Sequence, residues 1–371
     1  MTPRTNPPKI LGIATQGVGG GDEARLRALL GRFPAEFYPF ERDAKFKSFR
    51  GLLSAIRRLR PNLVVMEGTG IAGGLAVLLS HWFAEVPYVV SSGDAIGPFV
   101  GAQMPWLRIP FDIYERLLFR NCSGFIGWTP YFVGRALTFS APRAITAAGW
   151  APFPVDMDNA LTWRARIREE LNIDSHTLVF GIAGSLAWSH RVGFCYGREL
   201  VEAIRDVERK DIAVLIVGGG DGYSRLERIA GDRIGKQVYL IGRVPRHEVP
   251  AYLAAMDVAS LPQSVDQVGS FRYTTKLSEY LAAGLPIVTG QIPLAYDWPN
   301  DWLWRLPGLS PWDKIYTKAL STLMETISWE SLERKRQAVP TQLREFDKHD
   351  QVCRVTEFLH DILLASRKDT S

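Results

Sequence analysis

Short apolar runs alternate with amphipathic segments through the first 150 residues. Leu26, Leu29 and Leu30 lie on one face of a predicted helix over residues 22–31. Short apolar strands that alternate with helices predict an α/β fold with a doubly wound parallel sheet, which binds ligands at the carboxyl ends of its strands. The predicted strands span residues 9–15, 35–40, 62–67, 87–92, 124–128 and 143–147.

The alternation stops at residues 149–156, which contain two prolines, and then resumes in the second half of the chain. We therefore expect an N-terminal Rossmann-like domain over residues 1–150 and a second over 151–348. For the C-terminal helix at 349–371, packing back on the first domain is one option. Residues 298–311, rich in tryptophan and proline, are expected to be irregular. The later strands are predicted at 177–183, 212–217, 237–242, 258–261 and 287–289.

Length and composition narrow the class of protein. The chain has 371 residues, enough for two domains of roughly 150 each, and its 46% hydrophobic content excludes disorder over most of it. The longest apolar run, 71–84, is shorter than the roughly 18 residues of a membrane span, and the N-terminus does not read as a signal peptide, so we expect a cytoplasmic protein. Three widely spaced cysteines predict neither a disulfide framework nor a zinc site. A net charge of +5 suits an anionic ligand or membrane surface and does not require nucleic acid.

Four groups of residues follow strands, or open a helix, in the second domain. Glycines let the backbone approach phosphate, an arginine pairs with phosphate oxygens, and a helix N-terminus offers free N–H groups. A glutamate one turn into such a helix can accept hydrogen bonds from both hydroxyls of a ribose. Together they favour a nucleotide diphosphate site, although each has a structural alternative as a tight turn or a solvated side chain. The groups are Gly184–Leu186 (with Ser185) and Arg191; Gly218 and Gly219 within 218–222; Gly242, Arg243, Val244 and Pro245; and Thr274, Thr275, Lys276 and Glu279.

Residues 179–290 resemble the C-terminal half of family 4 glycosyltransferases, the group 1 retaining sugar transferases with the GT-B fold of two Rossmann-like domains facing a cleft. The motifs that carry the resemblance are Gly184–Leu186 with Arg191, Gly218–Gly222, Gly242–Pro245 with Ala254–Asp257, and Lys276–Val288. The resemblance implies that Glu279 holds the nucleotide ribose, and that Arg191 with the Thr274 and Thr275 amides holds the diphosphate. It also implies a nucleotide sugar as substrate, with no separate cofactor and no bound metal.

The chain departs from this family at two positions. Many members have a glutamate where this chain has Phe271; the neighbouring Arg272 either replaces it as a phosphate ligand or lies on the surface. A family histidine corresponds approximately to Gly93, which leaves Asp94 as the ionisable group at that strand end. Asp94 is our candidate acceptor base or oxocarbenium stabiliser, with a helix N-cap before Ile96 as its alternative role.

The first domain offers two further features on the acceptor side. A glycine-rich loop follows the first strand and either approaches the donor sugar or acceptor, or forms a tight turn; it contains Gly17, Gly19, Gly20 and Gly21. Residues 45–60 and 104–120 are basic amphipathic stretches, which suit either an anionic membrane surface or core helices with basic outer faces.

The resulting hypothesis is transfer of a hexose from a nucleotide sugar to a hydroxyl of a glycan, a lipid-linked saccharide or a small acceptor, with retention and without metal. The enzyme would be cytoplasmic, or peripheral on the cytoplasmic membrane face. Two alternatives stay open, because the family histidine and first glutamate are missing. One is a non-catalytic nucleotide-sugar-binding partner of another transferase, and the other is a GT-B sugar-nucleotide epimerase.

Overall fold

The computed structural model describes residues 9–153, 156–271, 275–298, 301–340 and 344–368. The chain divides into two compact units: unit 1 comprises Met1–Gly149 and Arg344–Ser371, and unit 2 comprises Trp150–Leu343. These divisions fall one residue before the expected boundary at 150/151 and five before that at 348/349.

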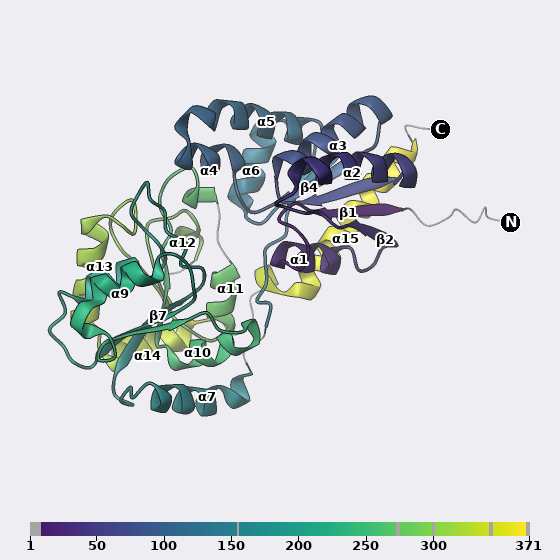
Figure 1. Ribbon diagram of the computed structural model, residues 1–371. Helices are drawn as coiled ribbons and strands as arrows, with labels where there is room; N and C mark the ends of the chain where they lie inside the picture. Colours follow the sequence, from purple (N-terminus) through teal and green to yellow (C-terminus); the bar gives the residue numbers. More distant parts are fainter. Residues whose placement is uncertain (1–8, 154–155, 272–274, 299–300, 341–343, 369–371) are drawn as a thin grey trace. The chain divides into compact units, whose positions relative to one another are not determined.

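Unit 1 is built on a six-stranded, wholly parallel sheet (Figure 1). The order reverses beside β1, whose Ile10 pairs with Ala35 on one side and Leu63 on the other. A point where strand order reverses is where open α/β sheets bind ligands. In spatial order the strands are β2 (Ala35–Tyr38), β1 (Ile10–Ala14), β3 (Leu63–Glu67), β4 (Tyr88–Ser92), β5 (Gly124–Gly127) and β6 (Ala144–Thr146).

Helices cover this sheet and bury the apolar faces that the periodicity predicted. The C-terminal helix α15 (Lys348–Lys368) belongs to the same unit: Phe358 and Ile362 pack against Gly124 of β5, and the Gln351 Oε1 accepts a hydrogen bond from the Ala148 N–H at 3.2 Å. The other helices are α1 (Gly21–Leu29), α2 (Lys45–Leu59), α3 (Ile71–Ala84), α4 (Ile96–Gln103), α5 (Arg108–Arg120) and α6 (Pro130–Thr138), with a 3₁₀ turn, η1 (Pro105–Leu107), before α5.

Unit 2 repeats the architecture with a second six-stranded parallel sheet, whose order reverses between β7 and β10. The expectation that residues 298–311 are irregular is wrong in part, because Leu303–Arg305 forms the edge strand β12, which pairs Leu303 with Ile287. Leu303–Arg305 lies among tryptophans and prolines and ends in an arginine, so no apolar run marks it in the sequence. The spatial order is β12, β11 (Ile287–Thr289), β10 (Val258–Leu261), β7 (Leu178–Ala183), β8 (Ile212–Val217) and β9 (Val238–Gly242).

The helices of unit 2 enclose a core that includes Phe180, Val214 and Leu320, all fully buried. They are α7 (Met157–Glu170), α8 (Arg198–Ile204), α9 (Tyr223–Ala230), α10 (Val249–Ala255), α11 (Thr275–Ala282), α12 (Leu294–Asp297), α13 (Lys314–Thr326) and α14 (Trp329–Ala338). Short 3₁₀ turns are η2 (Gly231–Arg233), η3 (Arg246–Glu248) and η4 (Gly269–Phe271), and η5 (Arg344–Phe346) precedes α15 in unit 1.

A buried ionic cluster ties three elements of unit 2 together. The carboxylate of Asp257, fully buried after α10, pairs with Arg164 at 2.7 Å, Arg168 at 2.6 Å and Arg336 at 2.9 Å. It also accepts the Val179 N–H of β7 at 2.9 Å. Asp257 therefore holds α7 and α14 to the central strand of the sheet.

Candidate functional site

The loops after β7 and β8 form a glycine floor in unit 2. A Cβ added to Gly218 would collide with the carbonyl oxygen of Gly184, so this close approach of two backbones requires glycine. Three backbone hydrogen bonds fix the loops: Gly184 N–H to Val217 O at 2.8 Å, Gly218 N–H to Gly242 O at 2.8 Å, and Leu186 N–H to Gly219 O at 3.1 Å. The carboxyl ends of β7, β8 and β9 thus meet at one place, as the sequence motifs required.

Two cationic side chains lie over this floor. The Lys276 ammonium lies against Gly184, where an added Cβ would collide with its terminal atoms, and 4.5 Å from the centre of the Tyr196 ring. The Arg243 side chain covers Gly219, with its Cβ 3.3 Å from the position of an added Cβ there. Bare backbone beneath two cations is suited to a phosphate group.

Helix α11 presents Glu279 one turn after Lys276. Its opposite face is buried through Leu277, Tyr280 and Leu281, and the Tyr280 hydroxyl accepts the Ala183 N–H at 3.4 Å, next to Gly184. Burial raises the pKa of Glu279, and the charges of Lys276 and Arg246 oppose that rise. The structure thus brings Gly184, Gly218, Gly219, Arg243, Lys276 and Glu279 into one region.

The other described donor-side residues lie in loops or at the start of a helix. Arg191 is exposed in the turn of a loop whose stem is closed by paired hydrogen bonds between Ser189 and Phe194. Ser185 is exposed, and Val244 is half-buried beside Arg243. Thr275 is the first residue of α11. Arg272 and Thr274 lie outside the described residues.

At least two of the motif residues, Asp257 and Asp221, stabilise the fold. Asp257 forms the buried ionic cluster described above. Asp221 accepts a hydrogen bond from the Trp188 N–H through its Oδ1 at 2.8 Å, which ties the loop after β8 to the loop after β7. The aspartates of these motifs therefore hold the glycine floor and its sheet in place.

In unit 1 a buried cluster lies at the carboxyl ends of β3, β4 and β5. The Arg25 guanidinium donates to the Glu67 carboxylate at 2.5 Å, to the Ser91 hydroxyl at 2.9 Å and to the Ala147 carbonyl at 2.6 Å. Trp128 donates its indole N–H to Glu67 at 3.1 Å, and its ring stacks 4.7 Å from the Arg25 guanidinium. The Arg25–Glu67 ion pair is almost fully buried and gives the reversal point of the sheet a rigid polar floor.

Asp22, at the start of α1, faces this cluster. Burial raises its pKa to about 6, with further increases from the negative charges of Glu67 and Asp94 and an opposing effect of Arg25. Asp22 is not among the site residues predicted from the sequence; the available signal was a carboxylate directly after the glycine run that ends at Gly21.

Asp94 is exposed after β4, and Ala95 occupies the N-cap position of α4, so the expected alternative of an N-cap at Asp94 is wrong by one residue. The space beside Gly93 is filled by the Trp128 ring, whose nearest atom would be 2.8 Å from an added Cβ. Trp128 therefore stands where a side chain at position 93 would lie.

The glycine-rich loop combines turn geometry with exposure. Gly17 and Gly19 have φ of 102° and 78°, which favours glycine. Gly20 is the N-cap of α1, Gly21 is its first residue, and the Gly19 N–H donates to the Glu23 carboxylate at 2.6 Å. An added Cβ at Gly19 or Gly21 would meet nothing within 4 Å, so each of these two glycines borders open space that a ligand could enter.

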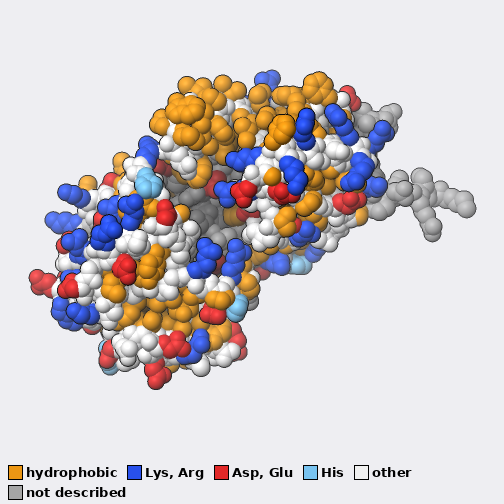
Figure 2. Space-filling view, in the orientation of Figure 1, with side chains coloured by type: hydrophobic (Ala, Val, Ile, Leu, Met, Phe, Trp, Pro, Cys, Tyr) orange, Lys and Arg blue, Asp and Glu red, His pale blue; other side chains and the backbone are white. Residues whose placement is uncertain are grey.

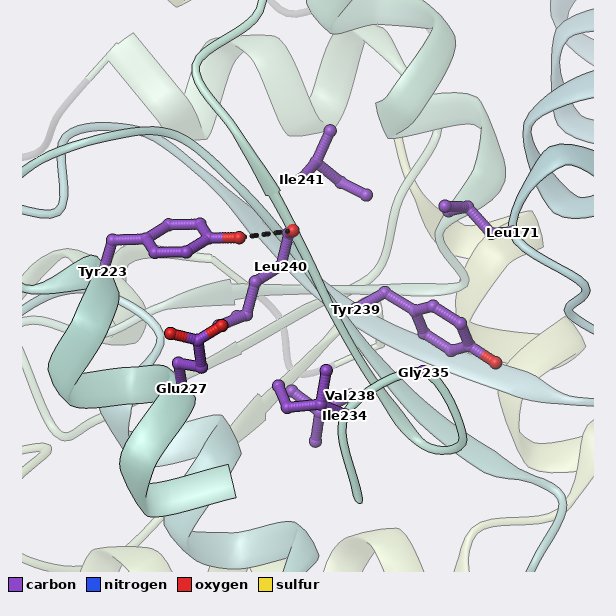
Figure 3. A pocket seen from close by; sticks show the side chains of 9 residues that line it. All are labelled: Leu171, Tyr223, Glu227, Ile234, Gly235, Val238, Tyr239, Leu240 and Ile241. Carbon is purple, nitrogen blue, oxygen red and sulfur yellow. Dashed lines mark hydrogen bonds between the residues drawn. The ribbon is translucent and has the colours of Figure 1, made fainter. Parts of the chain in front are cut away.

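A separate hollow lies beside the edge strand β9 (Figure 3), lined by Tyr223, Glu227, Val238, Tyr239 and Leu240 among others. It contains none of the residues of the glycine floor. Within the described parts of the chain, no group of three or more His, Cys, Asp or Glu is placed to hold a metal ion.

Comparison with known proteins identifies the domain. Residues 177–300 match the family "Glycosyl transferases group 1". No curated protein matches the chain in sequence.

Solved structures match nearly the whole chain. Anabaena HepE in complex with UDP and glucose has a TM-score of 0.68 at 15% identity, covering 95% of this chain and 100% of its own. Sucrose-phosphate synthase from Thermosynechococcus elongatus has 0.68 at 14%, covering 96% and 100%. WaaG, a glycosyltransferase involved in lipopolysaccharide biosynthesis, has 0.62 at 14%, covering 94% and 99%. The chain therefore has the GT-B fold and carries a glycosyl transferases group 1 domain over residues 177–300, as its sequence motifs predicted.

Proposed function

We propose that the protein transfers a hexose from a nucleotide-diphosphate sugar to a hydroxyl group. The observation that carries the proposal is the glycine floor of Gly184 and Gly218 beneath Lys276 and Arg243, one helical turn from Glu279. The diphosphate would lie on the glycine floor between Lys276 and Arg243, and the Glu279 carboxylate would accept hydrogen bonds from both ribose hydroxyls. HepE, a structural relative, is known in complex with UDP-glucose, which makes a UDP-sugar the first donor to test.

Charge on the departing diphosphate would be stabilised by Lys276 and the N–H groups at the start of α11, with Arg191 reaching it from its exposed loop. Donors of this kind lower the barrier most when they are oriented before charge develops. Such a set of cations and backbone donors can serve without a metal ion. We propose that transfer proceeds with retention at the sugar carbon, as the sequence resemblance implies.

On the acceptor side, Asp22 joins Asp94 as a candidate base. In the proposed step the acceptor oxygen bonds to the sugar carbon, its proton passes to a carboxylate, and the electron pair of the broken bond leaves with the diphosphate. A carboxylate with a pKa near 6 is charged at neutral pH and is more basic than an ordinary aspartate. Asp22 is therefore suited to accept the proton of the acceptor hydroxyl.

We further propose that the acceptor is a lipid-linked saccharide or another glycan reached at the cytoplasmic membrane face. None of the helices in the described parts of the chain is long and apolar enough to cross a bilayer. WaaG, a structural relative, is a glycosyltransferase involved in lipopolysaccharide biosynthesis, which makes a lipid-linked glycan the first acceptor to test.

Calorimetry with UDP tests the donor site directly. Glu279→Ala is expected to weaken UDP binding by about 1.5–3 kcal/mol, because two hydrogen bonds to a charged group are lost. Glu330→Ala, at an exposed glutamate of α14, is the matched control and should bind UDP as the wild type does. Unchanged affinity of Glu279→Ala would refute the assignment of the ribose site.

Incubation with a panel of UDP-sugars, with and without acceptors, separates the alternatives. Release of UDP that depends on an acceptor supports the transferase. Tight UDP-sugar binding without turnover would instead indicate a non-catalytic partner of another transferase. Conversion of the sugar without an acceptor would indicate an epimerase.

A further inference from the structure

Unit 1 exposes an apolar surface over α3, α4 and α5. Figure 2 shows hydrophobic side chains gathered over these helices. We define the α3–α5 face by six residues that are between 38% and 74% exposed: Leu75 and Trp82 of α3, Trp106 of η1, and Ile109, Ile113 and Leu117 of α5. Large hydrophobic side chains this exposed are ordinary when scattered, but a contiguous set marks an interaction surface.

The two helices lie side by side, so the exposed residues form one surface. The Tyr114 hydroxyl of α5 donates to the Thr69 and Gly70 carbonyls at the start of α3, and Gly74 leaves room for its ring. Near the other end, the Trp82 indole N–H donates to the Asn121 side chain at 3.2 Å. These contacts fix the apolar rows of both helices in the same outward direction.

The core of unit 1 does not bury the α3–α5 face. Tyr114, Leu118 and Phe119 form the buried side of α5. Ile109, Ile113 and Leu117 recur every four residues and form a second apolar row, which is left outside. A second apolar row that the unit does not bury is available to a partner.

Positive charge flanks the face. Arg116 and Arg120 of α5 are exposed, while its two acids, Asp112 and Glu115, are engaged by Arg135. On the far side of α3 lies α2, which carries five exposed basic residues and no acid: Lys45, Lys47, Arg50, Arg57 and Arg58.

We propose that the α3–α5 face inserts into an anionic lipid bilayer, which places unit 1 on the membrane that bears the acceptor; this rests on the proposed function only for the identity of the acceptor. The row of Ile109, Ile113 and Leu117 would insert among the acyl chains, and the two tryptophans would lie at the level of the headgroups. The flanking arginines would pair with anionic lipid phosphates. A second copy of this chain fits less well, because a two-fold interface would bring like-charged rims together.

The test is co-sedimentation of the full chain with vesicles of phosphatidylglycerol and phosphatidylcholine in equal parts. Ile109→Ser combined with Ile113→Ser is expected to lower the partition coefficient about tenfold, because two side chains no longer enter the acyl region. The matched control replaces Leu161 and Ile315 by serine; these residues of unit 2 are 79% and 64% exposed, somewhat more than the two isoleucines at 70% and 55%. The control is expected to partition as the wild type does, and circular dichroism checks that both variants are folded.

Equal vesicle binding by the isoleucine variant and the wild type would overturn the proposal. A lipid-free dimer that the isoleucine variant abolishes, seen by sedimentation velocity, would overturn it in favour of self-association. Calorimetry with UDP is run on the same variants: loss of vesicle binding with unchanged UDP affinity supports the proposal. Failure of UDP to bind the wild type would count against the proposed function alone.

Discussion

Replacing Asp257 by alanine tests whether a residue of the family motif acts in the fold or at the nucleotide. The carboxylate is fully buried and is shared by Arg164, Arg168 and Arg336 at 2.6–2.9 Å. Its loss leaves three guanidinium groups without that partner and the Val179 N–H without its acceptor. We therefore expect a large loss of stability and no direct loss of UDP contacts.

The magnitude depends on how buried each arginine is. The Arg168 side chain is 5% exposed, and burial already lowers its pKa, so its charge becomes a nearly uncompensated buried ion. Arg168 keeps hydrogen bonds to the backbone carbonyls of Ala255 and Thr177, which hold the guanidinium but carry no countercharge. Arg164 and Arg336, whose side chains are 21% and 32% exposed, regain part of their hydration. Removing one partner of a buried pair costs about 3–5 kcal/mol, and we expect Asp257→Ala to fall in that range.

Scanning calorimetry with and without UDP is the assay, since UDP raises the unfolding temperature of the unit that binds it and so identifies the transition to follow. Asp211→Ala is the control, because Asp211 pairs with Arg209 at the surface and such pairs contribute about 0–1 kcal/mol. A loss below about 1 kcal/mol for Asp257→Ala would refute the argument. Full stability of Asp257→Ala combined with loss of UDP affinity would also refute it, and would indicate that Asp257 contacts the nucleotide.

Two further predictions concern catalysis. Arg191→Ala should lower the turnover number by about 10²–10³-fold, with a smaller change in donor affinity. Arg191→Lys should recover part of the lost turnover, because lysine keeps the charge but not the planar guanidinium. Full turnover by Arg191→Ala would indicate that other residues hold the diphosphate. The wild-type kcat/KM for transfer should fall as pH drops through about 6, where Asp22 takes up a proton, and Asp22→Asn should be slow without this inflection. Asp94→Asn should move the inflection to lower pH, because the Asp94 charge helps to raise the pKa of Asp22, and an inflection retained by Asp22→Asn would assign it to another group. Stability gives a second readout: the raised pKa makes the wild type lose stability as pH rises from about 4 to 6, and Asp22→Asn should lack that loss.

Most strands of the two sheets could be predicted because the central ones are buried on both sides and read as apolar runs. The strands over 212–217, 258–261 and 287–289 are predicted at their observed ends, and the other predicted strands within a residue or two. The edge strand β12 was missed because its residues, Leu303–Arg305, form no apolar run in the sequence, and its place depends on pairing with β11. Local pattern is therefore sufficient for strands that read as apolar runs and insufficient for an edge strand such as β12.

The donor site could be predicted because its chemistry is local to each strand end. The glycine at 184 and the glycine at 218 each follow an apolar run, and parallel strands bring their carboxyl ends to one edge. Asp22 could not be assigned in the same way, because its raised pKa depends on its burial and on the charges of Glu67 and Asp94, all of which arise only through folding. The Trp128 ring beside Gly93 is another contact between distant segments, and neither residue alone predicts it.

The two basic amphipathic stretches show where pattern and structure diverge. In α2 the core takes Leu52 and Ile56, and Phe46 is the large hydrophobic residue left more than a third exposed. In α5 the core takes one apolar row and leaves the row through Ile113 outside. Because one sheet can cover only one side of a helix, a helix with two apolar rows must expose one of them or find a partner. We therefore assign the proposed membrane insertion to α5, and a supporting positive charge to α2.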